Sequence, residues 1–215
     1  MKIDDQMYED IFAEEDVTEH VTLNKSEATA TVLDWAGSLF AALVVVLLVM
    51  TFLFRVIDVD GTSMESTLID SDKVIITNLF YTPHNGDVVV ISHGEEYEKP
   101  LVKRVIATEG QTLRIDFDTQ QVYVDGVLLD ETYIQGNTIP GDAEIPELIP
   151  EGKVFVMGDN RTVSLDSRYH EIGLINVTDI IGKAQLVIIP HSYENTEFGA
   201  VPKLDFSKIR YIYSD

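Results

Sequence analysis

The sequence contains no cysteine. A disulfide framework, a thiolate metal site and a cysteine nucleophile are therefore excluded. Basic residues are also few, with 15 lysines and arginines against 37 acids and a net charge of −22. Because nucleic-acid binding depends on basic groups that neutralise phosphates, we expect no nucleic-acid partner. No spacing of histidine, aspartate and glutamate resembles a metal site, and we expect neither a metal nor another cofactor.

A charge-free apolar run covers residues 36–54 (AGSLFAALVVVLLVMTFLF). As a helix it would extend about 28 Å, close to the roughly 30 Å of bilayer hydrocarbon. A buried core helix and a cleaved signal peptide are the alternatives, but the preceding segment is acidic and no small-residue cleavage site follows. We predict one uncleaved transmembrane helix over residues 35–55. The flanking lysines and arginines do not decide its orientation.

The segments on either side of this run differ in character. Residues 1–34 carry ten acids and two bases, which predicts a flexible acidic tail. Residues 56–215 contain short runs rich in valine and isoleucine, bounded by turn-forming residues, as is typical of β-strands. The runs are residues 73–77, 87–92, 101–107, 153–157 and 184–189.

The remaining segments favour hairpins and loops. Apolar and polar residues alternate in residues 112–117 and 121–124, and the turn signal Asp125-Gly126 follows. We therefore predict a mainly β fold: an antiparallel sheet domain in residues 56–110 and 151–215, with an inserted β subdomain in residues 111–150. Residues 194–215 are mixed in character and predict a loosely held tail.

Three groups of polar residues carry potential chemistry. Gly61 precedes a small hydroxyl residue in DGTSMESTL (60–68), where a glycine lets the backbone approach a substrate, although most such sequences are only turns. Lys103 lies between apolar pairs, and a desolvated lysine has a lowered pKa and can act as a base; the alternative is a lysine that snorkels from a strand edge. The third group, GDNRTVSLDSR (158–168), is either a structured loop or a set of surface ion pairs. None of the five histidines lies in a recognisable motif, which disfavours a histidine-based triad.

Taken in this order after one N-terminal span, these groups resemble the bacterial type I signal peptidases, and their Gram-positive branch in particular. The resemblance covers residues 35–190 and leaves the acidic tail outside. The matching elements are Gly61-Thr62-Ser63-Met64 with Thr67-Leu68, Gly86-Asp87-Val88-Val89-Val90, Lys103-Arg104-Val105-Ile106, and Gly158-Asp159-Asn160-Arg161 with Ser164, Asp166, Ser167 and Arg168.

The resemblance implies a serine–lysine dyad. Ser63 would be the nucleophile, Lys103 the general base, and Ser164 would hydrogen-bond and orient the lysine amine. Two ion pairs, Arg104 with Asp159 and Arg168 with Asp166, would support the site, and Met64, Val102 and Gly61 would contact the substrate. Because an ordinary lysine is protonated at neutral pH, this chemistry requires the Lys103 pKa to fall towards 7–8.

Two positions depart from the family pattern. Gly61 stands where some members have a serine that donates to the oxyanion, so the second oxyanion donor is unidentified. Ser66 stands in place of the usual proline, which would stiffen the turn.

The function implied is a membrane-anchored serine endopeptidase that removes signal peptides from secreted preproteins. The resemblance places the protein in the cell membrane as a single-pass protein, with a cytoplasmic N-terminus and an extracellular catalytic domain. The expected partners are preproteins, the lipid bilayer and, as a further candidate, the protein translocation machinery. A self-cleaving repressor-type protease is disfavoured by the span and the acidic tail. A non-catalytic membrane-anchored peptide-binding protein is the alternative, against which the intact Ser63, Lys103 and Ser164 argue.

Overall fold

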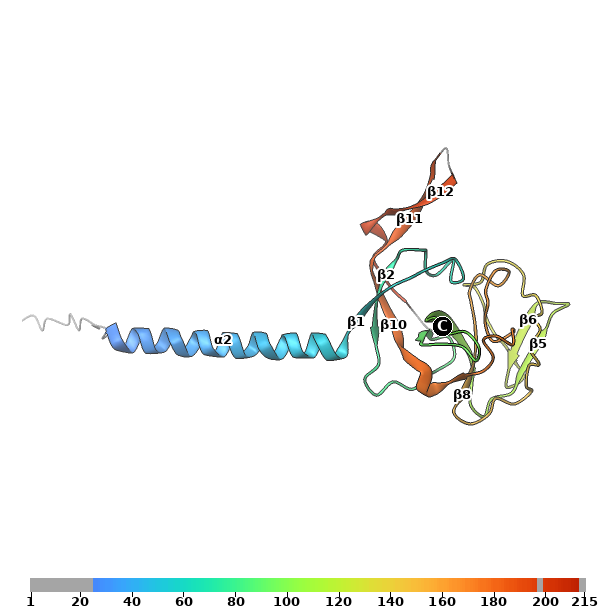
Figure 1. The fold of residues 1–215 in the computed structure, drawn as a ribbon, viewed down its shortest axis with the longest axis horizontal. Helices are drawn as coiled ribbons and strands as arrows, with labels where there is room; N and C mark the ends of the chain where they lie inside the picture. Colours follow the sequence, from blue (N-terminus) through green and yellow to red (C-terminus); the bar gives the residue numbers. More distant parts are fainter. Residues whose placement is uncertain (1–24, 197–198, 213–215) are drawn as a thin grey trace, which may run out of the picture. The chain divides into compact units, whose positions relative to one another are not determined.

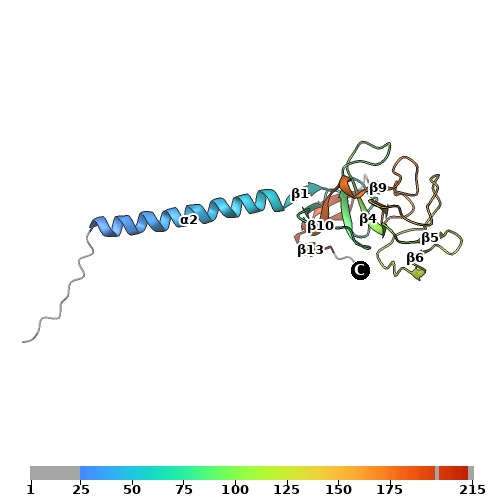
Figure 2. The same cartoon turned by 90° about the horizontal axis from the view of Figure 1, so that it is seen from below.

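The structure is a computed structural model that describes residues 25–196 and 199–212. It divides into two units, Met1–Leu48 and Val49–Asp215. The boundary falls within α2 (Lys25–Leu53), the one long helix described, which is labelled in Figures 1 and 2. By length and composition, its segment Thr29–Val49 can cross a membrane. The prediction of one N-terminal apolar helix is confirmed.

Helix α2 begins ten residues before the predicted start at residue 35. Residues 25–34 contain no glycine or proline, so nothing in them interrupts a helix that extends outward from the apolar run. The part of the predicted acidic tail in residues 1–24 lies outside the described residues. Along the span the apolar side chains are exposed, Trp35, Leu39 and Phe40 among them.

The second unit is built on one antiparallel sheet, as predicted. Its strand order is β1-β2-β10-β3-β4-β8-β9, and β13 also pairs with β10. The predicted valine- and isoleucine-rich runs form its central strands, and all four residues of β3 are buried. The strands are β1 (Arg55–Asp58), β2 (Lys73–Thr77), β3 (Val88–Ile91), β4 (Leu101–Thr108), β8 (Lys153–Met157), β9 (Ile175–Asn176), β10 (Ile180–Ile189) and β13 (Arg210–Tyr211).

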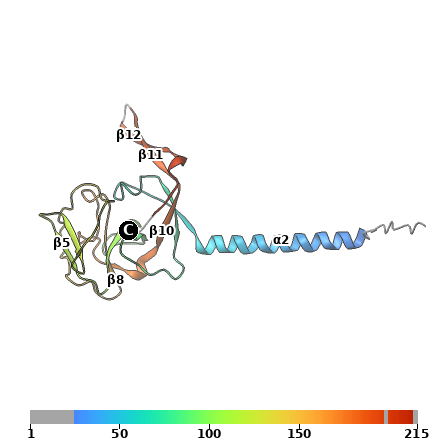
Figure 3. The same cartoon turned by 180° about the vertical axis from the view of Figure 1, so that it is seen from behind.

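A separate three-stranded sheet lies within the segment predicted as an inserted subdomain. It consists of β5 (Leu113–Asp116), β6 (Gln121–Val124) and β7 (Val127–Leu128), and it lies away from β1 in the views of the second unit (Figures 1 and 3). Asp125 and Gly126 have φ of 50° and 77°, which is typical of a type I′ hairpin turn. Leu113, Val122 and Val124 pack with residues of β4 and β8, so the small sheet shares a core with the main one.

The C-terminal segment is ordered into strands, and the expectation of a loose tail is wrong. Strands β11 (His191–Thr196) and β12 (Gly199–Leu204) form a hairpin, shown in red-orange in Figure 1. A 3₁₀ turn, Phe206–Lys208, then leads to β13, which lies beside β10 (Figure 2). A shorter 3₁₀ turn, Val177–Asp179, precedes β10. The hairpin residues are mostly polar and exposed, and therefore carry no core-facing alternation that would reveal strands.

Candidate active site

Ser63 lies in the turn that follows β1. The backbone N–H groups of Thr67 and Leu68 both donate to the Met64 carbonyl, at 2.9 and 2.8 Å, and close a hydrogen-bonded turn directly after the serine. Met64 and Leu68 are buried in a cluster with Val74 and Ile76 of β2. Burial of these two side chains fixes the turn against the sheet and sets the position of Ser63 at its start.

Lys103 reaches Ser63 from strand β4. The Lys103 side chain is only 2 % exposed, and its Nζ donates to Ser63 Oγ at 2.7 Å. Within the described residues Lys103 forms no ion pair with a carboxylate. The two residues that define the predicted dyad are therefore brought into hydrogen-bond contact, although they are 40 residues apart in sequence.

The surroundings of Lys103 favour its neutral form. Burial lowers the pKa of the amine from 10.5 to about 8, against an opposing effect of the Asp166 and Asp159 carboxylates. At pH 7 a shift of this size raises the neutral fraction about 300-fold. The amine is then able to accept a proton from a hydroxyl at neutral pH.

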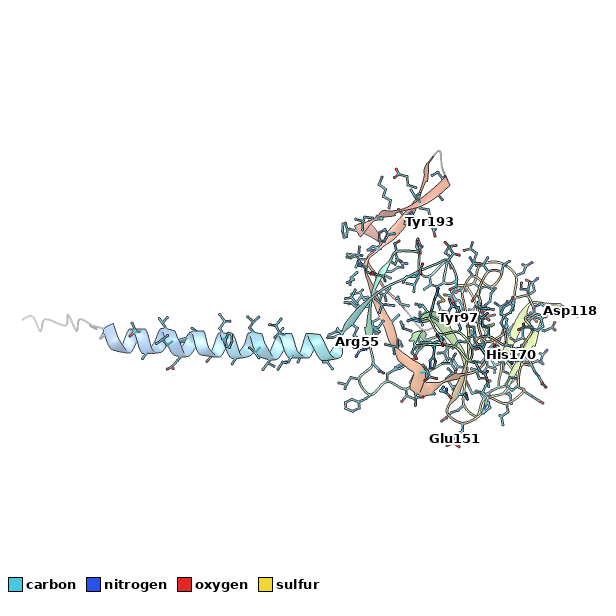
Figure 4. The ribbon with its side chains drawn as sticks, in the orientation of Figure 1. Arg55, Tyr97, Asp118, Glu151, His170 and Tyr193 are labelled. Carbon is cyan, nitrogen blue, oxygen red and sulfur yellow. The ribbon has the colours of Figure 1, made fainter. Side chains whose placement is uncertain are left out.

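The dyad opens into a cleft of about 530 Å³. Val102 and Met64, two of the residues predicted to contact substrate, line it, and Tyr97, labelled in Figure 4, lies on its wall. The other apolar lining residues are Ile57, Val59, Val90, Leu101 and Ile181. Gly61 does not line the cleft. It lies in the left-handed region with φ of 90°, where a residue with a side chain would be strained.

A buried arginine joins the lysine strand to the loop after β8. Arg104 holds Asp159 through two parallel hydrogen bonds, Nε to Oδ1 at 2.8 Å and Nη2 to Oδ2 at 2.7 Å. Its Nη1 donates to the Gly86 carbonyl at 2.7 Å, and its guanidinium lies 3.8 Å above the ring of Tyr133. The ion pair expected between Arg104 and Asp159 is present, and both members are buried.

The second expected pair is present as well. Arg168 Nε donates to Asp166 Oδ1, and Nη2 donates to Oδ2, each at 2.8 Å. Both side chains are fully buried. Asp166 Oδ2 also accepts the backbone N–H of Gly158 at 3.0 Å, so this pair fixes both ends of the loop between residues 158 and 168.

Ser164 is buried, but the expected hydrogen bond to the Lys103 amine is not formed. Its Oγ has no hydrogen-bond partner within the described part of the chain. The hydroxyl packs against Gly158 instead, where a Cβ atom would stand 2.3 Å from it. A buried hydroxyl without a partner costs about 1–3 kcal/mol.

Two further supports were not identified from the sequence. Arg161, in the loop of residues 158–168, forms a third buried ion pair with Glu131. It also donates to Thr138 Oγ1 at 2.9 Å. Ser66, in the position of the family proline, donates its hydroxyl to the Tyr133 carbonyl at 2.6 Å. Proximity of Arg161 to the other loop charges was visible in the sequence, but no signal pointed to Glu131 as its partner.

The neighbourhood of Ser63 also contains groups from the C-terminal hairpin. Tyr193, labelled in Figure 4, extends from β11 and donates its hydroxyl to Glu65 Oε1 at 2.5 Å. Burial and the Glu65 carboxylate raise the Tyr193 pKa to about 12. The Ser63 N–H makes no hydrogen bond within the described residues, whereas the Gly61 N–H donates to Asp70 Oδ1 at 2.7 Å.

Comparison with known proteins identifies the family of this chain. The family model for signal peptidase, peptidase S26, matches residues 32–189. Signal peptidase I P of Bacillus subtilis subsp. natto is 37% identical over 171 residues, which covers 74% of this chain and 90% of the relative. Signal peptidase I of Bacillus licheniformis is 35% identical over 185 residues, covering 81% and 96%. A crystal structure of a signal peptidase I from Enterococcus faecalis V583 is 26% identical, with a TM-score of 0.43, over 49% of this chain and 98% of that one. The chain belongs to the peptidase S26 family of signal peptidases.

Proposed function

We propose that this chain is a serine endopeptidase that cleaves signal peptides from secreted preproteins, with Ser63 as nucleophile and Lys103 as general base. One observation carries the assignment: the 2.7 Å contact between Ser63 Oγ and a buried Lys103 Nζ. A serine hydroxyl is a weak nucleophile until a base accepts its proton. The lowered pKa of Lys103 makes the amine such a base near neutral pH.

The reaction divides into two steps. The proton of the Ser63 hydroxyl moves to Lys103 Nζ while Oγ attacks the scissile carbonyl carbon. Lys103 then returns that proton to the leaving amine as the C–N bond breaks and an ester forms at Ser63. Water attacks the ester with Lys103 again as base, and the free serine is restored.

An oxyanion forms in each step, and hydrogen-bond donors near the nucleophile stabilise it. Backbone N–H groups aimed at this oxygen are typically its main stabilisers. We assign the first donor to the Ser63 N–H, which makes no hydrogen bond within the described residues.

Three buried groups keep the dyad in place in this proposal. The Arg104–Asp159 and Arg168–Asp166 pairs hold the loop 158–168 against β4. The third group is Ser164, which acts directly on the dyad. Its unpaired hydroxyl accepts a hydrogen bond from the Lys103 amine once substrate is bound. Catalytic hydrogen bonds commonly tighten only in the complex with substrate.

The substrate is an extended peptide. Strand β1 is at the edge of the described sheet, and an edge strand accepts a peptide by strand addition. Met64 and Val102 in the cleft suit small apolar side chains, consistent with small residues immediately before the cut and two residues earlier.

The proposal includes membrane attachment. Helix α2 anchors the chain as a single-pass protein, with the N-terminus in the cytoplasm and residues 56–215 outside. The catalytic domain comprises residues 56–110 and 151–215, and residues 111–150 form its insertion. Anchoring keeps the cleft at the bilayer, where the cleavage site of a preprotein emerges from the protein translocation machinery. The length and apolar character of α2 support membrane attachment.

The decisive experiment uses the full chain in lipid vesicles with a purified preprotein. Ser63→Ala and Lys103→Ala should each abolish cleavage, because each removes one half of the dyad. Ser38→Ala and Lys203→Ala, at exposed positions on α2 and β12, serve as matched controls and should cleave normally. Retained cleavage in either dyad variant would refute the assignment. A wild-type chain that binds preproteins but cuts none would favour the non-catalytic alternative.

A further inference from the structure

The C-terminal segment contacts the turn that carries the nucleophile. Strand β13 pairs with β10, with Arg210 opposite Val187. Ile212, just after β13, is buried in the same cluster as Met64 and Leu68. The family match ends at residue 189, so these contacts come from a part of the chain beyond the matched region.

Arg210 makes the polar contact to this turn. Its Nη2 donates to the carbonyl oxygen of Thr67 at 2.5 Å and lies 3.5 Å from Oδ2 of Asp72. The Asp72 carboxylate is fully buried. It accepts the backbone N–H of Ile69 at 3.1 Å and that of His191 at 2.6 Å. Asp72 therefore joins the end of the nucleophile turn to both the beginning and the end of the C-terminal segment.

Thr67 is held from two directions. Its hydroxyl donates to Asp159 and accepts from Arg104 Nη2 at 3.2 Å, while its carbonyl accepts from Arg210. Because hydrogen bonds close residues 64–68 into one turn, a displacement of Thr67 moves the whole turn, and Ser63 stands at its start. The hydroxyl of Thr67 contacts both members of the Arg104–Asp159 ion pair. The contact from Arg210 to the Thr67 carbonyl is independent of that pair.

We infer that Arg210 is a positioning residue: through the Thr67 carbonyl and Asp72 it holds the nucleophile turn so that Ser63 Oγ stays within hydrogen-bond reach of Lys103. This role rests on the proposed dyad. Arg210 contacts neither dyad residue, so it acts on geometry alone. Displacements of about 1 Å in a catalytic group can cost on the order of 100-fold in rate.

Arg210→Met tests the inference, because it keeps the length of the side chain and removes every donor. We expect kcat to fall about tenfold with KM within about twofold of wild type, since the transition-state geometry is affected more than binding. The pH at half-maximal activity should stay where it is in the wild type. Arg210→Lys should recover part of the lost kcat, because the single atom Nη2 makes both contacts and an ammonium group can replace it.

The control is Arg114→Met, which removes an exposed guanidinium from β5 and should leave both constants unchanged. Assays are run below the melting temperature of each variant, measured beforehand. A folded Arg210→Met enzyme with wild-type kcat would overturn the inference. A loss confined to KM, or one accompanied by a shift of the pH midpoint, would also overturn it, since these indicate altered binding or a hydrated lysine.

The two proposals fail separately. Cleavage that survives in Ser63→Ala or Lys103→Ala removes the dyad itself. Cleavage that is lost in both of these variants but unaffected in Arg210→Met removes only the positioning role.

Discussion

Gly158 lies directly against the backbone of the nucleophile: a Cβ atom built on Gly158 would stand 2.4 Å from the carbonyl oxygen of Ser63. The N–H of Asn160 donates to the same oxygen at 3.0 Å. The start of the loop after β8 and the serine turn are therefore in backbone contact, and only glycine at residue 158 permits this approach.

Gly158→Ala should consequently impair both activity and stability. The added methyl group would overlap both the Ser63 carbonyl oxygen and the Ser164 side chain, so both must move, and such overpacking typically costs about 1–3 kcal/mol. We expect kcat/KM to fall at least about tenfold, since the nucleophile itself is displaced. Urea unfolding and peptide cleavage measure the two effects. Wild-type values in both would show that the backbones separate without consequence.

Ser164→Ala should lower the cleavage activity without lowering the free energy of unfolding. The Ser164 hydroxyl is buried without a partner, so its removal should leave the free energy of unfolding unchanged or raise it by about 1 kcal/mol. Cleavage should fall at the same time, if the hydroxyl accepts from Lys103 in the substrate complex. Ser167→Ala is the contrasting variant. Ser167 Oγ accepts the Val156 N–H at 3.0 Å, and its loss should destabilise the fold. An active Ser164→Ala enzyme would exclude this serine from the mechanism.

The pH dependence of cleavage should report the Lys103 amine. Only the neutral amine accepts the serine proton, and its pKa is about 8. We therefore expect kcat/KM to rise about tenfold per pH unit below pH 8 and to level off above it. Initial rates on a peptide whose own charge is constant over this range give the profile. A midpoint near pH 10 would place Lys103 in water rather than in a buried pocket.

Asp166→Asn should move that midpoint to lower pH. Among the charges near Lys103, the Asp166 carboxylate is the largest influence that raises its pKa, and Arg168 lowers it. Neutralising Asp166 removes the stabilisation of the ammonium and leaves the Arg168 charge uncompensated, and both effects favour the neutral amine. The variant should also be less stable, because breaking a buried pair costs about 3–5 kcal/mol. A midpoint that rises would contradict this account.

The sequence predicted those parts of the fold that bury apolar side chains. The runs at residues 73–77 and 153–157 became β2 and β8 with the same boundaries. The Asp125-Gly126 turn was equally predictable, because it requires positive φ at two positions. In contrast, β11 and β12 are exposed on most of their residues, and without a buried face a strand leaves no pattern in the sequence.

The family motifs indicated the dyad and two ion pairs of the site, but the hydrogen bond they implied between Ser164 and Lys103 is not formed. Ser63, Lys103 and the two expected ion pairs were placed by these motifs, and their geometry agrees. The pairing of Arg161 with Glu131, 30 residues earlier, depends on how the inserted segment returns to the main sheet, which local sequence does not encode. Arg210 was unpredictable for the same reason, since its partner Thr67 is 143 residues away.

Lys103→Met should lose cleavage activity and at the same time gain stability. The amine has a pKa of about 8 in the fold and 10.5 in the unfolded chain. Above pH 10.5 it is neutral in both states and imposes no penalty. As the pH falls towards 8, the unfolded chain binds a proton that the folded protein does not, so the wild type loses stability relative to the variant.

Below pH 8 this penalty is complete and amounts to about 3 kcal/mol, from a shift of roughly 2.5 pKa units at 1.36 kcal/mol each. Lys103→Met should therefore be more stable than the wild type at pH 7, and the difference should shrink as the pH rises towards 10.5. Urea unfolding at several pH values measures this dependence, and its slope is independent of any packing change that methionine introduces. A stability difference that is constant with pH would mean that Lys103 has the same pKa in the folded and unfolded chain, which would remove the physical basis for its role as a base.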